Sequence, residues 1–542
     1  LNISDGKILT VKYNTEGLSI NPDTPYYLIS NFSNLGDNKS KIVVKDNDYV
    51  NHSIEYDENN NLMIKLLSLK EVENGKLTIS KDKITRKYDN NREETEIKDY
   101  NNQSIKLPQE TLQTLFGDSK EGVLTFNYLV PGLVVTQDDL KKDNIKGILF
   151  TGTNTRIGIA SGTNLNIGST NQENNSVFGM IGVDLTESGA LFKSQGQENT
   201  NNNITINTDY ALFVGNRVSS TGNNAYLFYN NNSTLTLTAN TINIGGNNVS
   251  SIGSYVYLFY NYSSIATIGS ETTKTISISN NEVNGSNYAY LIYNVNNSTL
   301  TLSANTINID GNSVSSIGNY AYLFRNDSSS TANIGSETTK TISISNNEVS
   351  GSGHTLLFYN RVNSTLTLSA NSISITQNAI SPISILDGKY SILFTISKTT
   401  SNINLYDNTP SFTLANNKMT EGSNGKGVIG IAMVDYSGNP TLNFINHSNT
   451  EAKVTLGHDI RSFYFDGKNN LANHEFINSI ITFRNSEGNN NGSFLIDLGL
   501  NMIETNTLNL ETNTTLLLTI NGSELIGNLK GVGTDPKLNI SD

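Results

Sequence analysis

The fifteen residues GSETTKTISISNNEV occur at Gly269–Val283 and again, unchanged, at Gly335–Val349. They are the clearest part of a repeat that runs through the middle of the chain. Its full period is about 65 residues and contains two similar halves. Repetition on this scale is typical of an elongated stack of coils, because each unit can bury its apolar face only against its neighbours.

Three other motifs mark the repeat. A strand-like motif, YLFYN, recurs five times. It begins at Tyr226, Tyr257, Tyr290, Tyr322 and, in weaker form, Leu356. An apolar residue followed three positions later by Asn forms a second series, whose members are Phe213–Asn216, Ile244–Asn247, Ile278–Asn281, Ile309–Asn312, Ile344–Asn347, Ile375–Asn378 and Leu414–Asn417. The segment STLTLxAN begins at Ser233, Ser298 and Ser364, in every second unit.

Short runs inside each half place an apolar residue at every second position, as in Leu235 and Leu237 or Ile242 and Ile244. This alternation predicts strands, and the Gly, Asn and Ser between the runs indicate turns. We therefore expect an all-β fold, a parallel β-helix in which equivalent strands of successive coils pair about 4.8 Å apart. With about 25 to 32 residues per coil, the chain would form roughly 17 to 20 coils.

Stacked coils would align the repeated asparagines in a column at the bends, with Asn247, Asn281, Asn312 and Asn347 above one another. An Asn ladder can satisfy the backbone groups of the turns and form hydrogen bonds along the stack. We interpret these asparagines as structural rather than as ligands. The tyrosines have the same first interpretation, a ladder in the core or at the surface, and a sugar-binding platform is the second.

The chain divides into four parts. Residues 1–100 are charged and β-rich, and we expect β-helix coils or a cap there. Residues 101–145 form an irregular joint or a small non-repetitive insertion, in which LPQETLQTLFG and TQDDLKKDN are candidates for short helices. Residues 146–434 carry the repeat-rich β-helix, and residues 435–542 its eroded coils.

The composition limits the class of protein. The 542 residues include no Cys and carry a formal net charge of −13. The lack of Cys excludes disulfides and thiolate metal sites, and the negative charge disfavours nucleic-acid binding. No apolar run approaches the length of a membrane span. Because the chain opens with Leu and no signal peptide, we expect a portion of a longer protein. LNISD at Leu1–Asp5 and at Leu538–Asp542 is either a coincidence or the mark of one unit in a tandem array.

The series from Phe213 to Asn417 resembles the passenger domains of type V autotransporters of Gram-negative bacteria, in particular the repeated FxxN of polymorphic membrane proteins. The accompanying GGAI is replaced by NNAYLF, SYVYLF, NYAYLI and NYAYLF. ILTVKYN and TPYYLIS, within residues 8–30, are similar to the segment that closes many such passengers. The resemblance implies a right-handed parallel β-helix at the cell surface, anchored to the outer membrane or secreted, with a C-terminal translocator barrel outside this chain.

No metal-binding pattern is found. The five histidines, His52, His354, His447, His458 and His474, have none of the spacings of known metal motifs. The last three could lie on neighbouring coils, but isolated surface histidines are the simpler interpretation.

No catalytic site is found either. Gly117–Asp118–Ser119 lacks the Gly-Ser continuation that builds the oxyanion hole in trypsin-like autotransporter proteases. A glycan-active β-helix needs paired carboxylates, which only residues 435–500 could supply, with Asp435, Asp459, Asp466 and Glu475. We therefore expect a protein that is not an enzyme and that uses no cofactor.

The leading hypothesis is a surface adhesin that binds a protein or glycan of a host cell or a neighbouring bacterium through loops on a rigid rod. Insertions in a repeat map to one face, so the candidate contact segments are residues 101–145, residues 176–205 and the irregular last third. A structural spacer, a toxin-like oligomerising passenger and a glycan-active enzyme are the alternatives. Direct membrane insertion by this fragment is not expected, because no apolar amphipathic segment is present.

Overall fold

The structure, a computed structural model, describes part of the chain. The described residues are 3, 7–11, 25–30, 36–44, 50–69, 77–80, 83–86, 94–99, 104–108, 124–127, 133–134, 147–151, 157–159, 164–168, 177–186, 189–197, 201–222, 224–381, 391–419, 428–435, 439–464, 478–489, 491–519 and 523–541. The chain splits into two compact units, Leu1–Gly158 with Leu165–Asp184 and Ile159–Asn164 with Leu185–Asp542.

The first unit begins with antiparallel and mixed pairing. Strand β5 (Leu62–Leu69) lies between β2 (Pro25–Ile29) and β4 (Val50–Tyr56) in an antiparallel sheet. β1 (Leu9–Val11) pairs in parallel with β3 (Ile42–Val44), which follows the 3₁₀ helix η1 (Gly36–Lys41). The segment TPYYLIS, which resembles a coil-closing strand, therefore contributes β2 to an antiparallel sheet.

Parallel pairing of successive strands appears later in the first unit. β6 (Leu77–Ser80), β10 (Leu124–Asn127), β12 (Gly147–Thr151) and β15 (Val177–Ile181) pair in parallel in that order. The remaining strands of this part are β7 (Lys83–Arg86), β8 (Glu94–Asp99), β9 (Ser104–Pro108), β11 (Leu133–Val134), β13 (Ile157–Ile159) and β14 (Asn164–Gly168). Most of the sequence proposed for two short helices lies outside the described residues.

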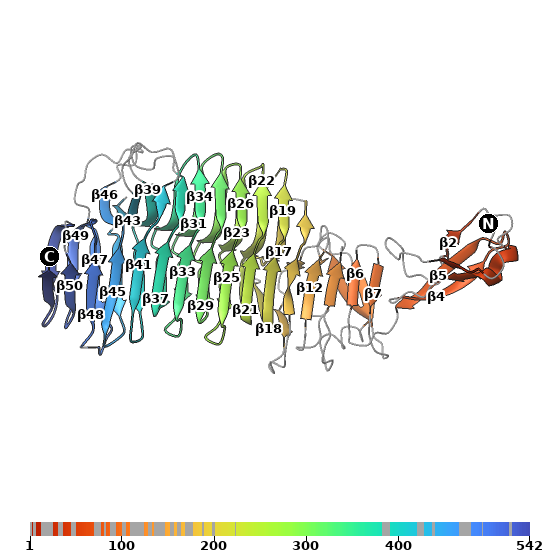
Figure 1. The fold of residues 1–542 in the computed structure, drawn as a ribbon, viewed down its shortest axis with the longest axis horizontal. Coiled ribbons are helices and arrows are strands. Elements are labelled where there is room, and N and C mark those ends of the chain that lie inside the picture. The colour runs from red at the N-terminus through yellow and green to blue at the C-terminus, as the bar shows by residue number, and fades with distance from the viewer. Residues whose placement is uncertain are drawn as a thin grey trace. The chain divides into compact units, whose positions relative to one another are not determined.

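In the second unit, equivalent strands of successive coils pair in parallel and form ladders (Figure 1). The YLF ladder contains β17 (Gly189–Gln195), β20 (Ala225–Asn231), β23 (Tyr255–Tyr262), β27 (Tyr288–Val295), β31 (Tyr320–Asp327), β35 (Thr355–Arg361), β39 (Ser391–Ser397), β43 (Val428–Asp435) and β46 (Asp459–Tyr464). The TLT ladder contains β24 (Ile265–Gly269), β28 (Thr299–Ser303), β32 (Thr331–Gly335), β36 (Thr365–Ala370), β40 (Thr400–Leu405), β44 (Thr441–Asn446) and β47 (Ile480–Asn485).

Two more ladders complete each coil. The TISIS ladder contains β25 (Thr275–Ser279), β29 (Thr306–Asp310), β33 (Thr341–Ser345), β37 (Ser372–Thr376), β41 (Ser411–Ala415), β45 (Glu451–Leu456), β48 (Ser493–Asp497), β50 (Thr515–Thr519) and β52 (Lys537–Ser541). The short ladder contains β16 (Asp184–Leu185), β19 (Arg217–Ser220), β22 (Asn248–Ser251), β26 (Glu282–Gly285), β30 (Ser313–Ser316), β34 (Glu348–Gly351), β38 (Ala379–Ser381) and β42 (Lys418–Met419). Long strands run through two ladders: β18 (Asn202–Val214), β21 (Ser233–Gly245), β49 (Met502–Leu510) and β51 (Glu524–Gly531).

The apolar alternation of the sequence becomes the core. In β25, Ile276 and Ile278 are buried between partly exposed Thr and Ser, and the register places Ile307 and Ile309 beside them in the next coil. Burial of each aliphatic side chain contributes about 1.5 to 3 kcal/mol. A narrow core repeated in every coil thus stabilises a chain with only 36% hydrophobic residues.

The predicted asparagine column is confirmed. Asn281 donates from Nδ2 to Oδ1 of Asn312 at 2.9 Å and to the carbonyl oxygen of Ile244 at 2.8 Å, and its backbone N–H donates to the same Oδ1 at 3.1 Å. The ladder members in successive coils are Asn216, Asn247, Asn281, Asn312, Asn347, Asn378 and Asn417. The residue before a ladder member has a positive φ, 62° at Gly246 and 53° at Asn280, which explains the recurring Gly-Asn and Asn-Asn pairs.

A second asparagine ladder lies where the YLF strand ends. Nδ2 of each member donates to Oδ1 of the next at 2.8 to 2.9 Å, through Asn230, Asn261, Asn294, Asn326 and Asn360. These asparagines are the last residue of each YLFYN motif, so the same motif supplies both a strand and a polar bend. Both ladders are fully buried and fix the register of neighbouring coils.

The fold class is therefore a parallel β-solenoid, without an α-helix among the described residues. Its right-handed sense stays a prediction. The solenoid has about nine turns, fewer than the roughly 17 to 20 expected. The ladder asparagines lie 31 to 35 residues apart from Asn216 to Asn378, which is close to the estimate. The difference therefore arises elsewhere in the chain, for example where β2, β4 and β5 pair antiparallel instead of forming coils. In the part of the chain that the structure describes, no helix has the length and apolarity needed to cross a membrane.

Candidate functional site

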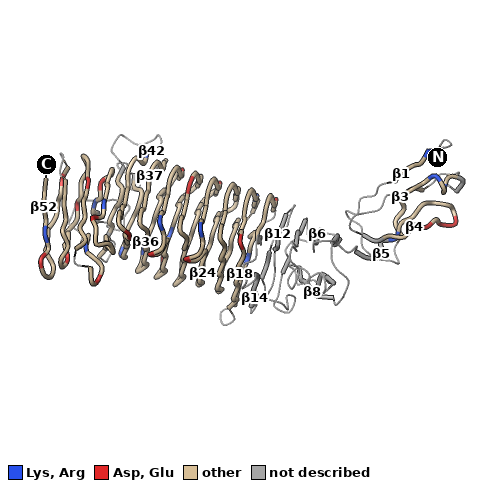
Figure 2. The backbone as a smooth tube through the Cα atoms, turned by 60° about the horizontal axis from the view of Figure 1, so that its bottom comes forward, with Lys and Arg blue, Asp and Glu red and all other residues tan. Residues whose placement is uncertain are grey.

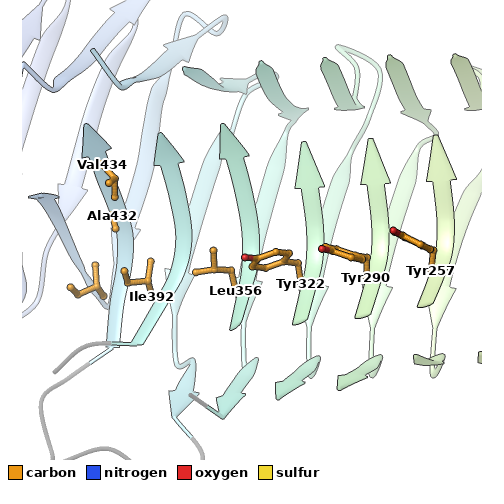
Figure 3. Close-up of a cluster of buried hydrophobic side chains, with 8 residues drawn as sticks. Tyr257, Tyr290, Tyr322, Leu356, Ile392, Ala432 and Val434 are labelled. Atoms are coloured by element: carbon orange, nitrogen blue, oxygen red, sulfur yellow. The ribbon is translucent and has the colours of Figure 1, made fainter. Parts of the chain in front are cut away.

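A cluster of tyrosines occupies the YLF ladder. Its centre is the buried column Tyr257, Tyr290 and Tyr322, which Leu356 and Ile392 continue (Figure 3). The tyrosines packed around this column are only partly buried: Tyr226, Tyr255, Tyr260, Tyr288, Tyr293, Tyr320 and Tyr359. β23, β27 and β31 each contain four successive buried residues instead of an alternation, so both faces of these strands are covered.

The rings of the cluster stack on one another along the coils. Tyr226 and Tyr257 have ring centroids 5.0 Å apart with planes 4° from parallel, and Tyr257 and Tyr290 are 5.1 Å apart at 10°. The ring faces are therefore covered by other rings. A sugar-binding platform needs exposed ring faces, so this geometry favours the structural interpretation of the tyrosine column.

Burial in this cluster disfavours ionised phenols. It raises the pKa of Tyr226 to about 12, and it also raises the pKa of Tyr257 and Tyr290 above the ordinary value. The hydroxyl of Tyr226 accepts a hydrogen bond from Nδ2 of Asn224 at 2.8 Å. The phenols of Tyr226, Tyr257 and Tyr290 thus stay protonated over the physiological pH range.

One cation lies inside the cluster, at a position where neighbouring coils have tyrosine. Arg325 pairs in register with Tyr293 and Tyr359, and its guanidinium lies 4.9 Å from the ring centroid of Tyr293. Nη2 of Arg325 is 2.6 Å from Oδ2 of Asp327, whose side chain is buried, and Nε of Arg361 lies 3.7 Å from Oδ1 of Asp327. Both members of the main pair are internally satisfied, so we interpret this group as a structural ion pair.

Next to the cluster, the bends between the short ladder and the YLF ladder expose isoleucine in every second coil. Ile252 is 74% exposed and Ile317 is 84% exposed. The register of the short ladder places Thr221, Ile252, Ser286, Ile317 and Ser352 at equivalent positions of successive coils. We call the bends that contain these residues the isoleucine corner.

The isoleucine bends are more exposed than the serine bends that alternate with them. Gly253 and Gly318 are exposed like the isoleucines before them, whereas Ser286 and Ser352 are half-buried. Oγ of Ser286 donates to the carbonyl oxygen of Gly253 at 3.0 Å, and Oγ of Ser352 donates to the carbonyl oxygens of Ile317 and Gly318. These bonds link each isoleucine bend to the bend of the following coil.

Aromatic rings extend the corner into the tyrosine cluster. Tyr255, Tyr288, Tyr320 and His354 form a column with centroids 4.5 Å, 5.3 Å and 5.0 Å apart. All four are half-buried. Charged residues are sparse on these coils (Figure 2). Corner and column together bring two exposed isoleucines and four half-buried aromatic rings to the same series of bends.

The histidines lie in separate environments where the structure describes them. His447 stacks on Tyr406 with centroids 4.2 Å apart, and Nε2 of His458 accepts a hydrogen bond from the backbone N–H of Asn417 at 3.1 Å. His52 lies in β4, while His474 is outside the described residues. The described residues contain no group of three or more His, Asp or Glu that could hold a metal ion.

The carboxylates considered for glycan chemistry are not brought together as a described pair. Asp459 forms an ion pair with Arg461 at 2.8 Å and accepts a hydrogen bond from the backbone N–H of Met502. Asp435 ends β43. Asp466 and Glu475 lie outside the described residues, as does Gly117–Asp118–Ser119.

The contact segments expected from the sequence do not include the isoleucine corner. Residues 101–145 lie mostly outside the described residues, and residues 176–205 are largely strand, in β15, β16, β17 and the start of β18. Sequence reasoning missed the isoleucine corner. The available signal was isoleucine at one bend position of alternate coils, where other coils have Thr or Ser.

Comparison with protein-family models, with curated proteins and with solved structures found no match for this chain. The class of this protein is therefore assigned from its structure alone: it is a repeat protein with a parallel β-solenoid fold. This architecture is consistent with the passenger domains that the sequence resembles.

Proposed function

We propose that this β-solenoid is an adhesin-like passenger that is displayed at the surface of a Gram-negative cell or secreted from it. In this proposal it binds a protein or glycan on a host or neighbouring cell, and a C-terminal translocator barrel lies outside this chain. The isoleucine corner with its aromatic column is the contact surface. A protein partner fits this apolar surface better than a glycan, because the tyrosine rings present little free face.

The observation that carries the proposal is the recurrence of an exposed isoleucine at one position of a rigid repeat. A single exposed apolar side chain needs no explanation. Ile252 and Ile317 are equivalent residues two coils apart, and each lies in a bend whose backbone accepts a hydrogen bond from a serine of the following coil. Interaction sites commonly place apolar anchors in such fixed positions because less side-chain freedom is lost on binding.

The test measures binding of the complete chain to cultured cells and to arrays of glycans and surface proteins. The variant Ile252→Ser/Ile317→Ser carries at both bends the residue of the intervening coils. Ile265→Ser is the matched control, because Ile265 is also exposed, at 49%, but lies in the TLT ladder. We expect the double variant to lose binding by more than tenfold and the control to keep it. Equal binding by all three proteins would contradict the proposal.

A structural spacer is the second candidate, and the continuous buried asparagine ladders favour it because they make successive coils a rigid support. Replacement of the solenoid by an unrelated rod of equal length separates the two functions. If the protein that carries the unrelated rod still adheres, the solenoid is a spacer. If adhesion is lost, the solenoid supplies a binding surface.

A further inference from the structure

We propose that Tyr255 and Tyr288 form a modification site, at which a one-electron oxidant joins the two side chains covalently as dityrosine. The product ties one coil of the solenoid to the next. This inference goes beyond the proposed function, because it concerns the chain itself and holds whatever the isoleucine corner binds.

The two rings are held together by the register of the coils. Tyr255 begins β23 and Tyr288 begins β27, and the two residues pair in register. Their ring centroids are 4.5 Å apart and their ring planes are 7° from parallel. The backbone N–H of Tyr288 donates to the carbonyl oxygen of Ser254 at 3.1 Å, which keeps the starts of the two strands aligned. The ring carbons ortho to the phenol oxygens, through which tyrosyl radicals couple, are therefore close together.

Partial exposure distinguishes this pair from the buried column. Tyr257 and Tyr290 stack at 5.1 Å, but these residues are only 5% and 2% exposed. Tyr255 and Tyr288 are half-buried. An oxidant in solution can therefore reach their rings, and water can accept the protons that the phenols lose on oxidation.

Other half-buried tyrosines of the cluster are less well placed for coupling. Tyr320 follows Tyr288 in the next coil at 5.3 Å, with its ring plane tilted by 57°. Tyr229 and Tyr260 pair in register with centroids 5.5 Å apart and planes 30° from parallel. Tyr255 and Tyr288 combine a shorter distance with nearly parallel planes, so coupling is expected there.

The oxidant for this reaction is hydrogen peroxide, acting through a peroxidase that removes one electron at a time. Each phenol loses one electron and its O–H proton, and the two phenoxyl radicals form one carbon–carbon bond between their ortho carbons. The hydrogen on each coupled carbon then leaves as a proton, and each oxygen takes up a proton, which restores both aromatic phenols. Hydrogen peroxide takes up the two electrons and two protons released overall and becomes two molecules of water.

The composition of the chain favours oxidation at tyrosine. The sequence contains 25 Tyr and neither Cys nor Trp. Thiols and indoles are the other side chains that readily lose one electron, and thiols compete for oxidants. A chain without Cys also cannot form a disulfide, so dityrosine supplies a covalent link between coils that would constrain the unfolded chain in the same way.

The test treats the complete chain with peroxidase and hydrogen peroxide at a protein concentration of about 1 µM, where coupling of rings already held together outpaces coupling between copies. We expect dityrosine fluorescence in a product that migrates as a single chain. Tandem mass spectrometry should place the link between Tyr255 and Tyr288. The repulsion between chains of net charge −13 also disfavours links between copies.

Phenylalanine variants test the assignment, because they keep the ring and remove the phenol. In Tyr255→Phe and in Tyr288→Phe, we expect the yield of dityrosine to fall more than fivefold. Tyr320→Phe, in the same aromatic column, is the matched control and should keep the wild-type yield.

Three results would overturn the inference. They are a wild-type chain that forms no dityrosine while N-acetyltyrosine couples in the same solution, a link that maps to other tyrosines, and links that form only between separate chains. Binding by Ile252→Ser/Ile317→Ser is measured without oxidant, so the proposed function is tested independently.

Discussion

The coils from Asn216 to Asn378 and the coils after Val428 have the same architecture but different polar interiors. In the first region both asparagine ladders are continuous from coil to coil. In the second, Asn446 and Asn485 instead donate to backbone carbonyls, including those of Ser493 and Asn513. The apolar core continues in both regions, with Phe444 and Phe483 stacked at 4.9 Å.

This difference separates two requirements of a solenoid. Apolar alternation is sufficient to build a coil, because Leu456, Ile496 and Leu518 of the later coils are as buried as the isoleucines of the repeat. Continuous polar ladders add specificity, because only one register satisfies every buried amide. The first region therefore tolerates little change at its polar positions, and the following predictions test this.

The largest effect is expected at the ion pair inside the tyrosine cluster. Arg325→Leu leaves the buried carboxylate of Asp327 without its main partner, and we expect a loss of about 3 to 5 kcal/mol in the free energy of unfolding. The double variant Arg325→Tyr/Asp327→Val installs the equivalent residues of the preceding coil, Tyr293 and Val295. It should lie within about 1 kcal/mol of the wild type. Urea denaturation measures both, and a single variant as stable as the double would contradict this account.

A smaller loss is expected from a gap in the first asparagine ladder. Asn312→Ala removes the acceptor of the Asn281 N–H and the donor to the Ile278 carbonyl, both buried. Unsatisfied groups of this kind cost about 1 to 3 kcal/mol each, so we expect a loss of about 2 to 4 kcal/mol. Asn308→Ala, at a half-buried position of β29, is the control and should change stability by less than about 0.5 kcal/mol. Equal losses in the two variants would refute a special role for the ladder.

The first asparagine ladder ends at Asn417, and its contribution to the free energy of unfolding should decrease at acid pH. Nε2 of His458 accepts the N–H of Asn417, which requires a neutral imidazole, and burial lowers the pKa of His458 while the nearby Asp459 opposes this. The folded chain therefore binds fewer protons than the unfolded chain below the ordinary pKa of about 6.5. The stabilisation is present above that pH and is lost as pH falls through the lower folded pKa.

His458→Asn provides the comparison, because an amide oxygen can take the same hydrogen bond and does not titrate. Unfolding free energies at pH 5 and pH 7.5 should differ less in this variant than in the wild type. An unchanged pH dependence would show that His458 does not carry the effect.

The smallest effect concerns the phenols of the tyrosine cluster. Burial raises the pKa of Tyr226 to about 12 from an ordinary value of about 10, and it raises the pKa of Tyr260 as well. Their contribution to stability is complete below pH 10 and is lost as pH rises through the folded pKa values. In an absorbance titration, we expect a fraction of the 25 tyrosines to ionise only after alkaline unfolding. Ionisation of all tyrosines near pH 10 in the folded protein would contradict the packing of the cluster.

Much of the fold could be predicted from local patterns. The alternation in TISIS and the spacing of the ladder asparagines led to the β-solenoid and to the column of Asn247, Asn281, Asn312 and Asn347. The coil number could not be obtained in this way, because bend lengths vary and β2, β4 and β5 pair antiparallel. The candidate site was missed because nothing in the sequence distinguishes Ile252 and Ile317 from the isoleucines of the core. Only their place on a bend exposes them.

The sequence alone determined the strand class, the repeat and the identity of the first polar ladder, because these depend on periodicity along the chain. Only the tertiary structure decided which bends are exposed, which tyrosine rings are covered and that Arg325 forms an ion pair with Asp327. Those properties depend on the register of one coil against the next and on the curvature of each bend, and no local pattern encodes them.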